Sequence, residues 1–83
     1  MKANISKTVK SVIAQECGIN RRSISNRTPF MSNQKLPYFD CVGALFVLQN
    51  KFHVSLPEAD YYKYKTVGNL IKNIIRQQHR LSK

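Results

Sequence analysis

The sequence has few of the residues that carry enzyme chemistry. It contains no tryptophan, three glycines, three prolines, two cysteines and only four acidic residues among 83. So few carboxylates leave little scope for paired acid/base catalysis, and neither a nucleophile triad nor a glycine-rich phosphate loop can be assembled. Cys17 and Cys41 lack Cys-x-x-Cys spacing, and His53 and His79 are isolated. We therefore expect reduced, buried thiols, surface histidines, no metal site and no enzyme.

Long apolar runs are also absent. No window approaches the roughly 18 apolar residues that a membrane-spanning helix needs, and the N-terminus leads into an amphipathic segment rather than an apolar signal core. These observations predict a cytoplasmic protein. The hydrophobic content of 42% over 83 residues predicts one folded domain, residues 1–83.

Positive charge dominates the polar residues. Fourteen Lys and Arg stand against Glu16, Asp40, Glu58 and Asp60, which gives a net charge of +10 and a pI near 10.1. Such a charge favours an acidic partner, whether a protein, a nucleic acid or a membrane surface. An acidic protein is our first expectation, and no small-molecule substrate is predicted.

The hydrophobic periodicity predicts an all-α fold with four helices. Apolar residues recur at helical spacing from about residue 4 to 17, and a second helix, apolar on nearly every face, begins at Pro37. Ser55-Leu56-Pro57-Glu58 fits a capping box for a short third helix, and Thr66 caps the last one. Residues 18–36 form a long basic loop, which we expect to pack down through Ile24 and Phe30.

The last helix carries the most regular apolar stripe. Its members follow the spacing i, i+3, i+4, i+7, i+8 and are Val67, Leu70, Ile71, Ile74 and Ile75. We expect all five to face the core.

Apolar positions along most of the chain follow one family pattern. They are Ile5, Val9, Val12-Ile13, Gly18-Ile19, Ile24, Phe30, Val42, Leu45, Leu48, Phe52, Leu56-Pro57 and Thr66-Val67. With this spacing the chain resembles the acyl carrier proteins, without gaps from about Ile5 to Ile75. The resemblance implies a right- and left-turning four-helix bundle, with three longer helices, whose members carry acyl intermediates on a phosphopantetheine arm.

The motif that holds the arm in this family is altered here. The family's Asp-Ser-Leu at the start of helix two reads Pro37-Tyr38-Phe39, so the attachment position is a tyrosine. Its hydroxyl lies at the end of a rigid ring, where a misplacement of about 1 Å already costs on the order of a hundredfold in rate. No serine lies between Gln34 and Ser55, and Ser32 is a weak substitute. We therefore expect no cofactor, although a carrier in fatty-acid or polyketide synthesis with an unconventional attachment site remains an alternative.

The exposed face of helix two also departs from the family. There that face is acidic and docks onto basic patches, whereas here Asp40 is its only acid. The corresponding residues are Phe39, Gly43, Phe46, Gln49, Asn50 and Lys51. Exposed apolar pairs rimmed by polar groups often mark protein contacts. We therefore predict a protein-interaction or regulatory module, with Met31 and Tyr38 bordering the apolar patch. The alternative is that the basic loop covers Phe39 and Phe46.

Two groups of residues form the predicted partner site. The contact face of helix two comprises Tyr38, Phe39, Phe46 and Asn50. The positive charge of the site comes from two clusters. The loop contributes Arg21, Arg22, Arg27 and Lys35, and the last helix contributes Lys72, Arg76 and Arg80. A solvated helix face is the plainer interpretation of that last stripe.

Nucleic-acid binding is the alternative function. The segment Tyr61-Tyr62-Lys63-Tyr64-Lys65 alternates aromatic and basic residues, which suits base stacking and phosphate pairing. One or two of these tyrosines are also expected to fill the core, and no known nucleic-acid motif accompanies them.

Overall fold

The predicted all-α class is confirmed. The computed structural model describes residues 4–32 and 34–81, without the side chains of residues 80 and 81. The three long helices are α1 (Ile5–Cys17), α2 (Tyr38–Phe52) and α3 (Val67–Leu81), and two 3-10 helices, η2 (Arg21–Ser23) and η3 (Glu58–Lys63), lie between them. The described residues form no strand, only an isolated antiparallel bridge between Pro29 and Thr66.

The ends of α1 and α2 use left-handed residues. Gly18 ends α1 with φ 65°, and its N–H donates to the Ala14 carbonyl, the conformation that glycine adopts without steric cost. α2 starts after Pro37, which supplies an extended φ and ψ, and ends at His53, with φ 55°. α3 is capped by Thr66, because its Oγ1 accepts the Asn69 N–H at 3.1 Å as predicted.

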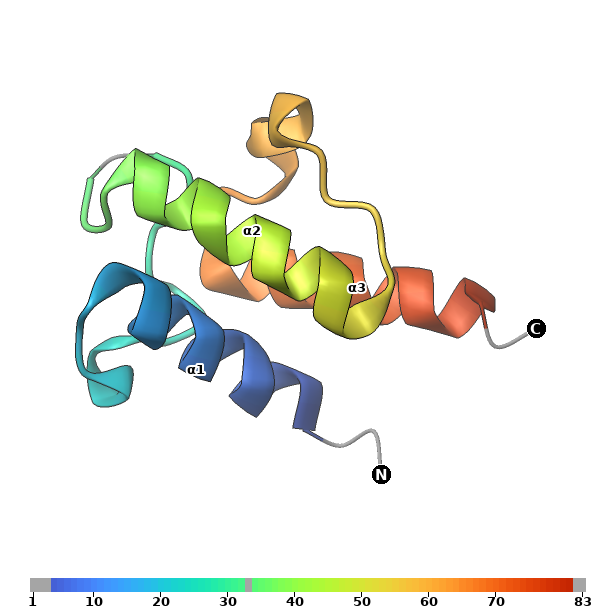
Figure 1. Cartoon of the computed structure of the whole chain (residues 1–83), viewed down its shortest axis with the longest axis horizontal. Coiled ribbons are helices and arrows are strands. Elements are labelled where there is room, and N and C mark those ends of the chain that lie inside the picture. Colours follow the sequence, from blue (N-terminus) through green and yellow to red (C-terminus); the bar gives the residue numbers. More distant parts are fainter. Residues whose placement is uncertain (1–3, 33, 82–83) are drawn as a thin grey trace.

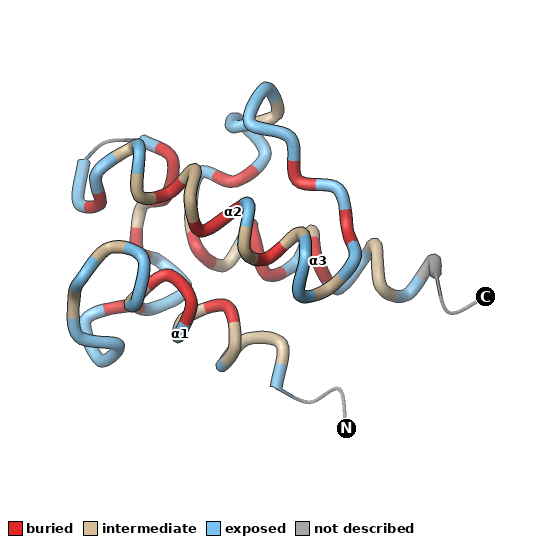
Figure 2. The backbone as a smooth tube through the Cα atoms, in the orientation of Figure 1, coloured by how far each residue is buried: buried red, intermediate tan, exposed pale blue. Residues whose placement is uncertain are grey.

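The three long helices enclose one core. α1 packs beside α2, and α3 runs behind both, while η3 stands on the connection from α2 to α3 (Figure 1). Buried residues follow the inner sides of the helices and continue into the long loop (Figure 2). The loop anchors Ile24 and Phe30 are both buried, as expected, together with Met31 and Leu36.

The apolar stripe of α3 is one residue narrower than predicted. Four of its five members are buried, but Ile75 is 47% exposed. At about 100° per residue, Ile75 lies roughly 80° from Val67 around the helix axis, so it falls at the edge of the stripe. The spacing alone placed it in the core, and that prediction was wrong.

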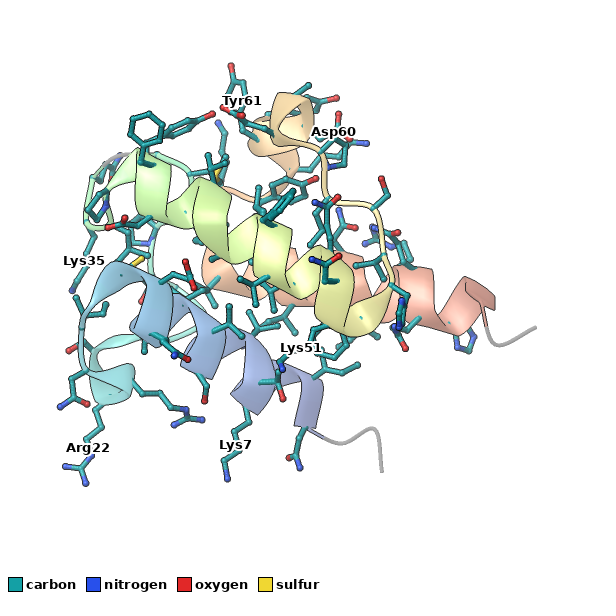
Figure 3. All side chains as sticks on the ribbon, in the orientation of Figure 1. Lys7, Arg22, Lys35, Lys51, Asp60 and Tyr61 are labelled. Atoms are coloured by element: carbon teal, nitrogen blue, oxygen red, sulfur yellow. The ribbon has the colours of Figure 1, made fainter. Side chains whose placement is uncertain are left out.

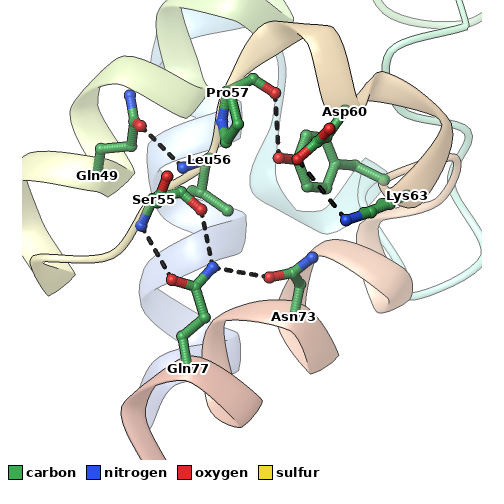
Figure 4. A network of polar contacts seen from close by, with 9 residues as sticks. Gln49, Ser55, Leu56, Pro57, Asp60, Lys63, Asn73 and Gln77 are labelled. Atoms are coloured by element: carbon green, nitrogen blue, oxygen red, sulfur yellow. Dashed lines mark hydrogen bonds and ion pairs between the residues drawn. The ribbon is translucent and has the colours of Figure 1, made fainter. Parts of the chain in front are cut away.

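The capping box predicted at Ser55 is also wrong. η3 begins after Pro57 and has no side-chain cap. The main chain of Ser55 pairs instead with the Gln77 amide, whose Oε1 accepts the Ser55 N–H at 3.0 Å and whose Nε2 donates to the Ser55 carbonyl at 2.8 Å (Figure 4). Gln49 Oε1 accepts the Leu56 N–H at 2.8 Å. Side chains of α2 and α3 therefore fix the segment that precedes η3.

The long loop is tied to the start of α3 by main-chain bonds. Phe30 N–H donates to the Lys65 carbonyl at 2.8 Å, and Val67 N–H donates to the Thr28 carbonyl at 3.0 Å. Gly68 N–H donates to the Asn26 carbonyl at 2.9 Å, and a Cβ at Gly68 would lie only 3.0 Å from that oxygen. Glycine therefore permits the loop to approach α3 this closely.

Candidate interaction site

α2 carries two apolar faces, of which only one packs in the core. Cys41, Ala44, Leu45 and Leu48 are buried. On the outer side, Phe39 is 86% exposed and Phe46 is 67% exposed. These two, with Gly43 and Asn50, form what we call the phenylalanine face.

The outer side of α2 is not covered by the rest of the chain. The alternative that the long loop covers the two phenylalanines is wrong, because the loop folds down onto the start of α3. An apolar pair thus remains exposed to solvent, in the place predicted for a contact face.

The borders of the phenylalanine face are more acidic than the sequence suggested. A Cβ at Gly43 would lie 3.0 Å from Glu16 Oε1, so the carboxylate of α1 covers this glycine. Asp40, on α2 itself, is half-buried. Gln49 does not belong to the face, because its side chain turns toward Leu56. Glu16 lies at the border of this face only because α1 packs against α2, and no local signal in the sequence predicts that packing.

Tyr38 lies at the N-terminal end of the phenylalanine face. Its hydroxyl donates to Glu58 Oε2 at 2.9 Å, and this hydrogen bond raises the pKa of Tyr38 above its ordinary value. The raised pKa keeps the phenol protonated at neutral pH, and the hydrogen bond fixes the direction of its hydroxyl. Met31, predicted to border the same patch, is instead buried, and its backbone has a left-handed φ of 56°.

A pocket of about 570 Å³ opens beside Tyr38. Its walls come from the loop, from the start of α2, and from η3 with the segment that joins it to α3. The lining residues are Pro29, Met31, Ser32, Gln34, Tyr38, Tyr61, Lys65 and Thr66. We call this the Tyr61 pocket; sequence reasoning missed it, because three separate segments contribute to it.

The tyrosines of the aromatic and basic segment have different roles. Tyr64 is buried, donates its hydroxyl hydrogen to the Pro57 carbonyl at 3.1 Å, and has a pKa raised by burial to about 12. Tyr61 and Tyr62 are exposed and meet edge to face at 6.0 Å between centroids. Lys63 lies 5.9 Å from the Tyr62 centroid and 3.7 Å from Asp60. One tyrosine therefore fills the core, as expected, and two remain available for contact.

The predicted basic residues are exposed wherever their side chains are described. Arg21, Arg22, Arg27 and Lys35 lie in the loop, and Lys72 and Arg76 lie on α3. Arg80 falls outside the described side chains. Figure 3 shows Lys7, Arg22 and Lys35 on the side of α1 and the loop, away from Asp60 and Tyr61 in η3. Across the described residues one ion pair forms, between Lys63 and Asp60, so charge there is largely uncompensated.

The two cysteines are not activated. Burial raises the pKa of Cys17 to about 11 and also raises that of Cys41. Cys41 is buried, whereas Cys17 is half-buried rather than fully buried as expected. Both histidines are exposed. The described part of the chain contains no group of three or more His, Cys, Asp or Glu placed to hold a metal ion.

Two further observations complete the description of the site. Within the described residues, no helix combines the length and the apolar character that crossing a membrane requires. No protein-family model matches the chain. The exposed phenylalanine face, the Tyr61 pocket beside it and the uncompensated positive charge are therefore the features on which a function can be argued.

Proposed function

We propose that the protein is an acyl-carrier-like helical bundle that acts as a protein-interaction module and carries no phosphopantetheine arm. The order and relative lengths of the helices support the bundle. A long helix, a long loop, a second long helix, a short helix and a third long helix follow one another, as the resemblance implies. The proposed partner is a protein with an apolar contact segment and an acidic surface.

The exposure of the phenylalanine face is the single observation that carries this proposal. Two large aromatic side chains lie seven residues apart on one helix and remain mostly in water. Exposed aromatic residues contribute disproportionately to protein interfaces, because their burial removes a large apolar area from solvent. A partner that covers them supplies the contact that α2 lacks within its own chain.

Charge specifies the kind of partner. Glu16 and Asp40 border the phenylalanine face, so the partner segment that covers Phe39 and Phe46 is apolar rather than acidic. The partner's carboxylates lie further out, against the exposed arginines and lysines of the loop and α3. Electrostatic attraction of this kind raises the association rate and weakens as salt is added.

The environment of Tyr38 argues against carriage of an arm. The hydrogen bond to Glu58 fixes the position of the Tyr38 hydroxyl, and a modifying enzyme would have to displace this contact to place the oxygen in its own site. The hydroxyl also lies beyond a six-membered ring, far from the position of a serine oxygen on the same backbone. The double variant Pro37→Asp with Tyr38→Ser restores the family's first two motif residues and should accept an arm only if the bundle has the family's backbone geometry.

The test of the proposed interface compares two charged substitutions on exposed apolar residues. Phe46→Asp places a carboxylate in the phenylalanine face, and Ile75→Asp places one on α3, where 47% of the side chain is exposed. Partners captured from the native host are identified, purified and titrated by calorimetry. We expect Phe46→Asp to weaken binding at least about tenfold, as loss of an aromatic anchor does.

The control outcomes distinguish binding from folding. Ile75→Asp adds one negative charge beside Arg76, so it should weaken binding clearly less than Phe46→Asp, and this smaller loss should disappear at high salt. Both variants should unfold within a few degrees of the parent chain. A large drop in the melting temperature of Phe46→Asp alone would place this residue in the core. Equal affinity of parent and Phe46→Asp for every captured protein would refute the interface.

Nucleic-acid binding is a second candidate, favoured by the exposed arginines Arg21, Arg22 and Arg27. Phosphate contacts release counterions, so affinity for a single-stranded oligonucleotide would fall steeply and linearly with the logarithm of salt concentration. Phe46→Asp would then have little effect, whereas the triple variant of the three arginines to glutamine would abolish binding. The reverse pattern would support the protein interface.

A further inference from the structure

The Tyr61 pocket extends the proposed interface beyond α2. Tyr38, which lines the pocket, directly precedes Phe39 on the phenylalanine face, so the two surfaces adjoin. We infer that the pocket holds an apolar side chain of the partner protein together with a neighbouring carboxylate, and that Lys65 binds this carboxylate. This inference rests on the proposed function for the identity of the occupant, but the pocket can be tested separately.

The walls of the pocket are fixed before any ligand binds. The segment that carries Pro29 is joined to the segment that carries Lys65 by the hydrogen bond from Phe30 N–H to the Lys65 carbonyl. The bridge between Pro29 and Thr66 continues this pairing. The Tyr38 hydroxyl is held by Glu58, which restrains the wall on the α2 side. A preformed site loses little conformational entropy on binding.

The shape and lining suit an apolar group that carries a single negative charge. A volume of about 570 Å³ falls within the range of roughly 300–1,000 Å³ that pockets for small organic groups occupy. Pro29, Met31 and the tyrosine rings present apolar surface, while Ser32 and Gln34 offer hydrogen-bonding groups. This combination favours an aromatic or aliphatic side chain over a purely polar one.

Lys65 determines the sign of the ligand. Among the described residues that line the pocket, it is the only charged one. Asp60 pairs with Lys63, and the described residues show no ion pair between Lys65 and an acid. Glu58 keeps its negative charge while it accepts the Tyr38 hydroxyl, so the ligand's carboxylate is expected at the Lys65 side of the pocket, away from Tyr38.

The probe for this site is phenylpropionate, with phenylpropanol as its uncharged counterpart. Both are titrated into the full chain while amide chemical shifts are followed by NMR. We expect saturable shifts concentrated at residues 30–32, 34, 38, 61, 65 and 66. The carboxylate should bind roughly two- to fivefold more tightly than the alcohol, the range expected for a solvent-exposed ion pair.

Matched variants separate the pocket from its surroundings. Lys65→Gln should remove the preference for the carboxylate, whereas Lys63→Gln, two residues away and outside the pocket lining, should preserve it. Tyr61→Ala should weaken both probes, and Tyr62→Ala should weaken neither. Equal binding of the two probes to the parent chain, shifts scattered over the surface, or equal effects of the two lysine variants would overturn the inference.

The proposed function and the pocket can fail independently. Phe46→Asp should leave probe binding unchanged, because Phe46 does not line the pocket. If Lys65→Gln weakens the captured protein partner by the same factor as it weakens phenylpropionate, the partner occupies the pocket as inferred. If phenylpropionate binds but Lys65→Gln does not change the affinity for the partner, the occupant is a free organic acid. The inference about the partner is then wrong.

Discussion

The two sides of α2 both carry apolar residues, but one side is buried in the core and the other is exposed to solvent. Leu45 and Phe46 are neighbours in the sequence, yet Leu45 is 2% exposed and Phe46 is 67% exposed. Both would be counted as core residues by hydropathy alone. The difference shows that this helix carries apolar surface that the fold of the described residues leaves in water. Exposed apolar surface is unfavourable in water, and an exposed apolar patch often marks a binding site.

The largest expected effect separates these neighbours directly. Leu45→Ala should lower the free energy of unfolding by about 2–5 kcal/mol, because it removes buried methyl groups and leaves a cavity. Phe46→Ala should change it by about 0.5 kcal/mol or less, because the ring contacts mainly solvent. Urea denaturation of both variants measures the difference. Similar losses in the two variants would contradict the assignment of the two sides of α2.

A second comparison sets the buried Tyr64 against the exposed Tyr62. The pKa of Tyr64 is raised from 10.0 to about 12, so the folded chain binds this proton more tightly than the unfolded chain does. The stabilisation is complete below pH 10 and is lost as the pH rises toward 12, on the order of 1 kcal/mol per pH unit. Tyr62 lacks this burial, because 56% of it is exposed.

A phenylalanine variant tests that pH dependence. Tyr64→Phe should flatten the fall in unfolding free energy between pH 10 and 12 relative to the parent chain. Cys17, with a pKa near 11, contributes to the same fall in the parent and in the variant and cancels in the comparison. Parallel curves for the parent and Tyr64→Phe would mean that Tyr64 does not hold its proton in the core.

The smallest expected effect concerns adjacent isoleucines on α3. Ile74→Val should cost about 1 kcal/mol, because Ile74 is fully buried, and Ile75→Val should cost much less. Thermal denaturation followed by circular dichroism resolves a difference of this size. A greater loss of stability in Ile75→Val than in Ile74→Val would mean that all five residues of the stripe face the core, as the sequence predicted.

Local patterns predicted the helices well because each helix carries its own signal. Gly18, Pro37 and Thr66 each mark a helix end through backbone chemistry that does not depend on the rest of the fold. The apolar spacing identified most of the buried residues of α1 and α3, but it placed Ile75, at the edge of the α3 stripe, in the core. Another failure arose where a distant residue competes with a local one, as at Ser55, whose main chain pairs with Gln77 rather than taking part in a capping box.

The candidate site was only partly predictable for the same reason. Phe39 and Phe46 could be proposed from helical spacing, and the exposure of the loop arginines from their charge. The carboxylate of Glu16 beside Gly43 and the Tyr61 pocket depend on packing between segments far apart in the sequence. Contacts between such distant segments produce no periodic pattern that a single sequence could reveal.

The most direct test of an interaction module that lacks the arm is the intact mass of the chain. One sample is purified from the native host, and a second is incubated with coenzyme A and a broad-specificity phosphopantetheinyl transferase, with an ordinary acyl carrier protein as a positive control. We expect the unmodified mass of the chain in both samples, because Tyr38 replaces the serine and Glu58 holds its hydroxyl. Added mass equal to one arm in either sample would contradict the proposal and identify the protein as a carrier.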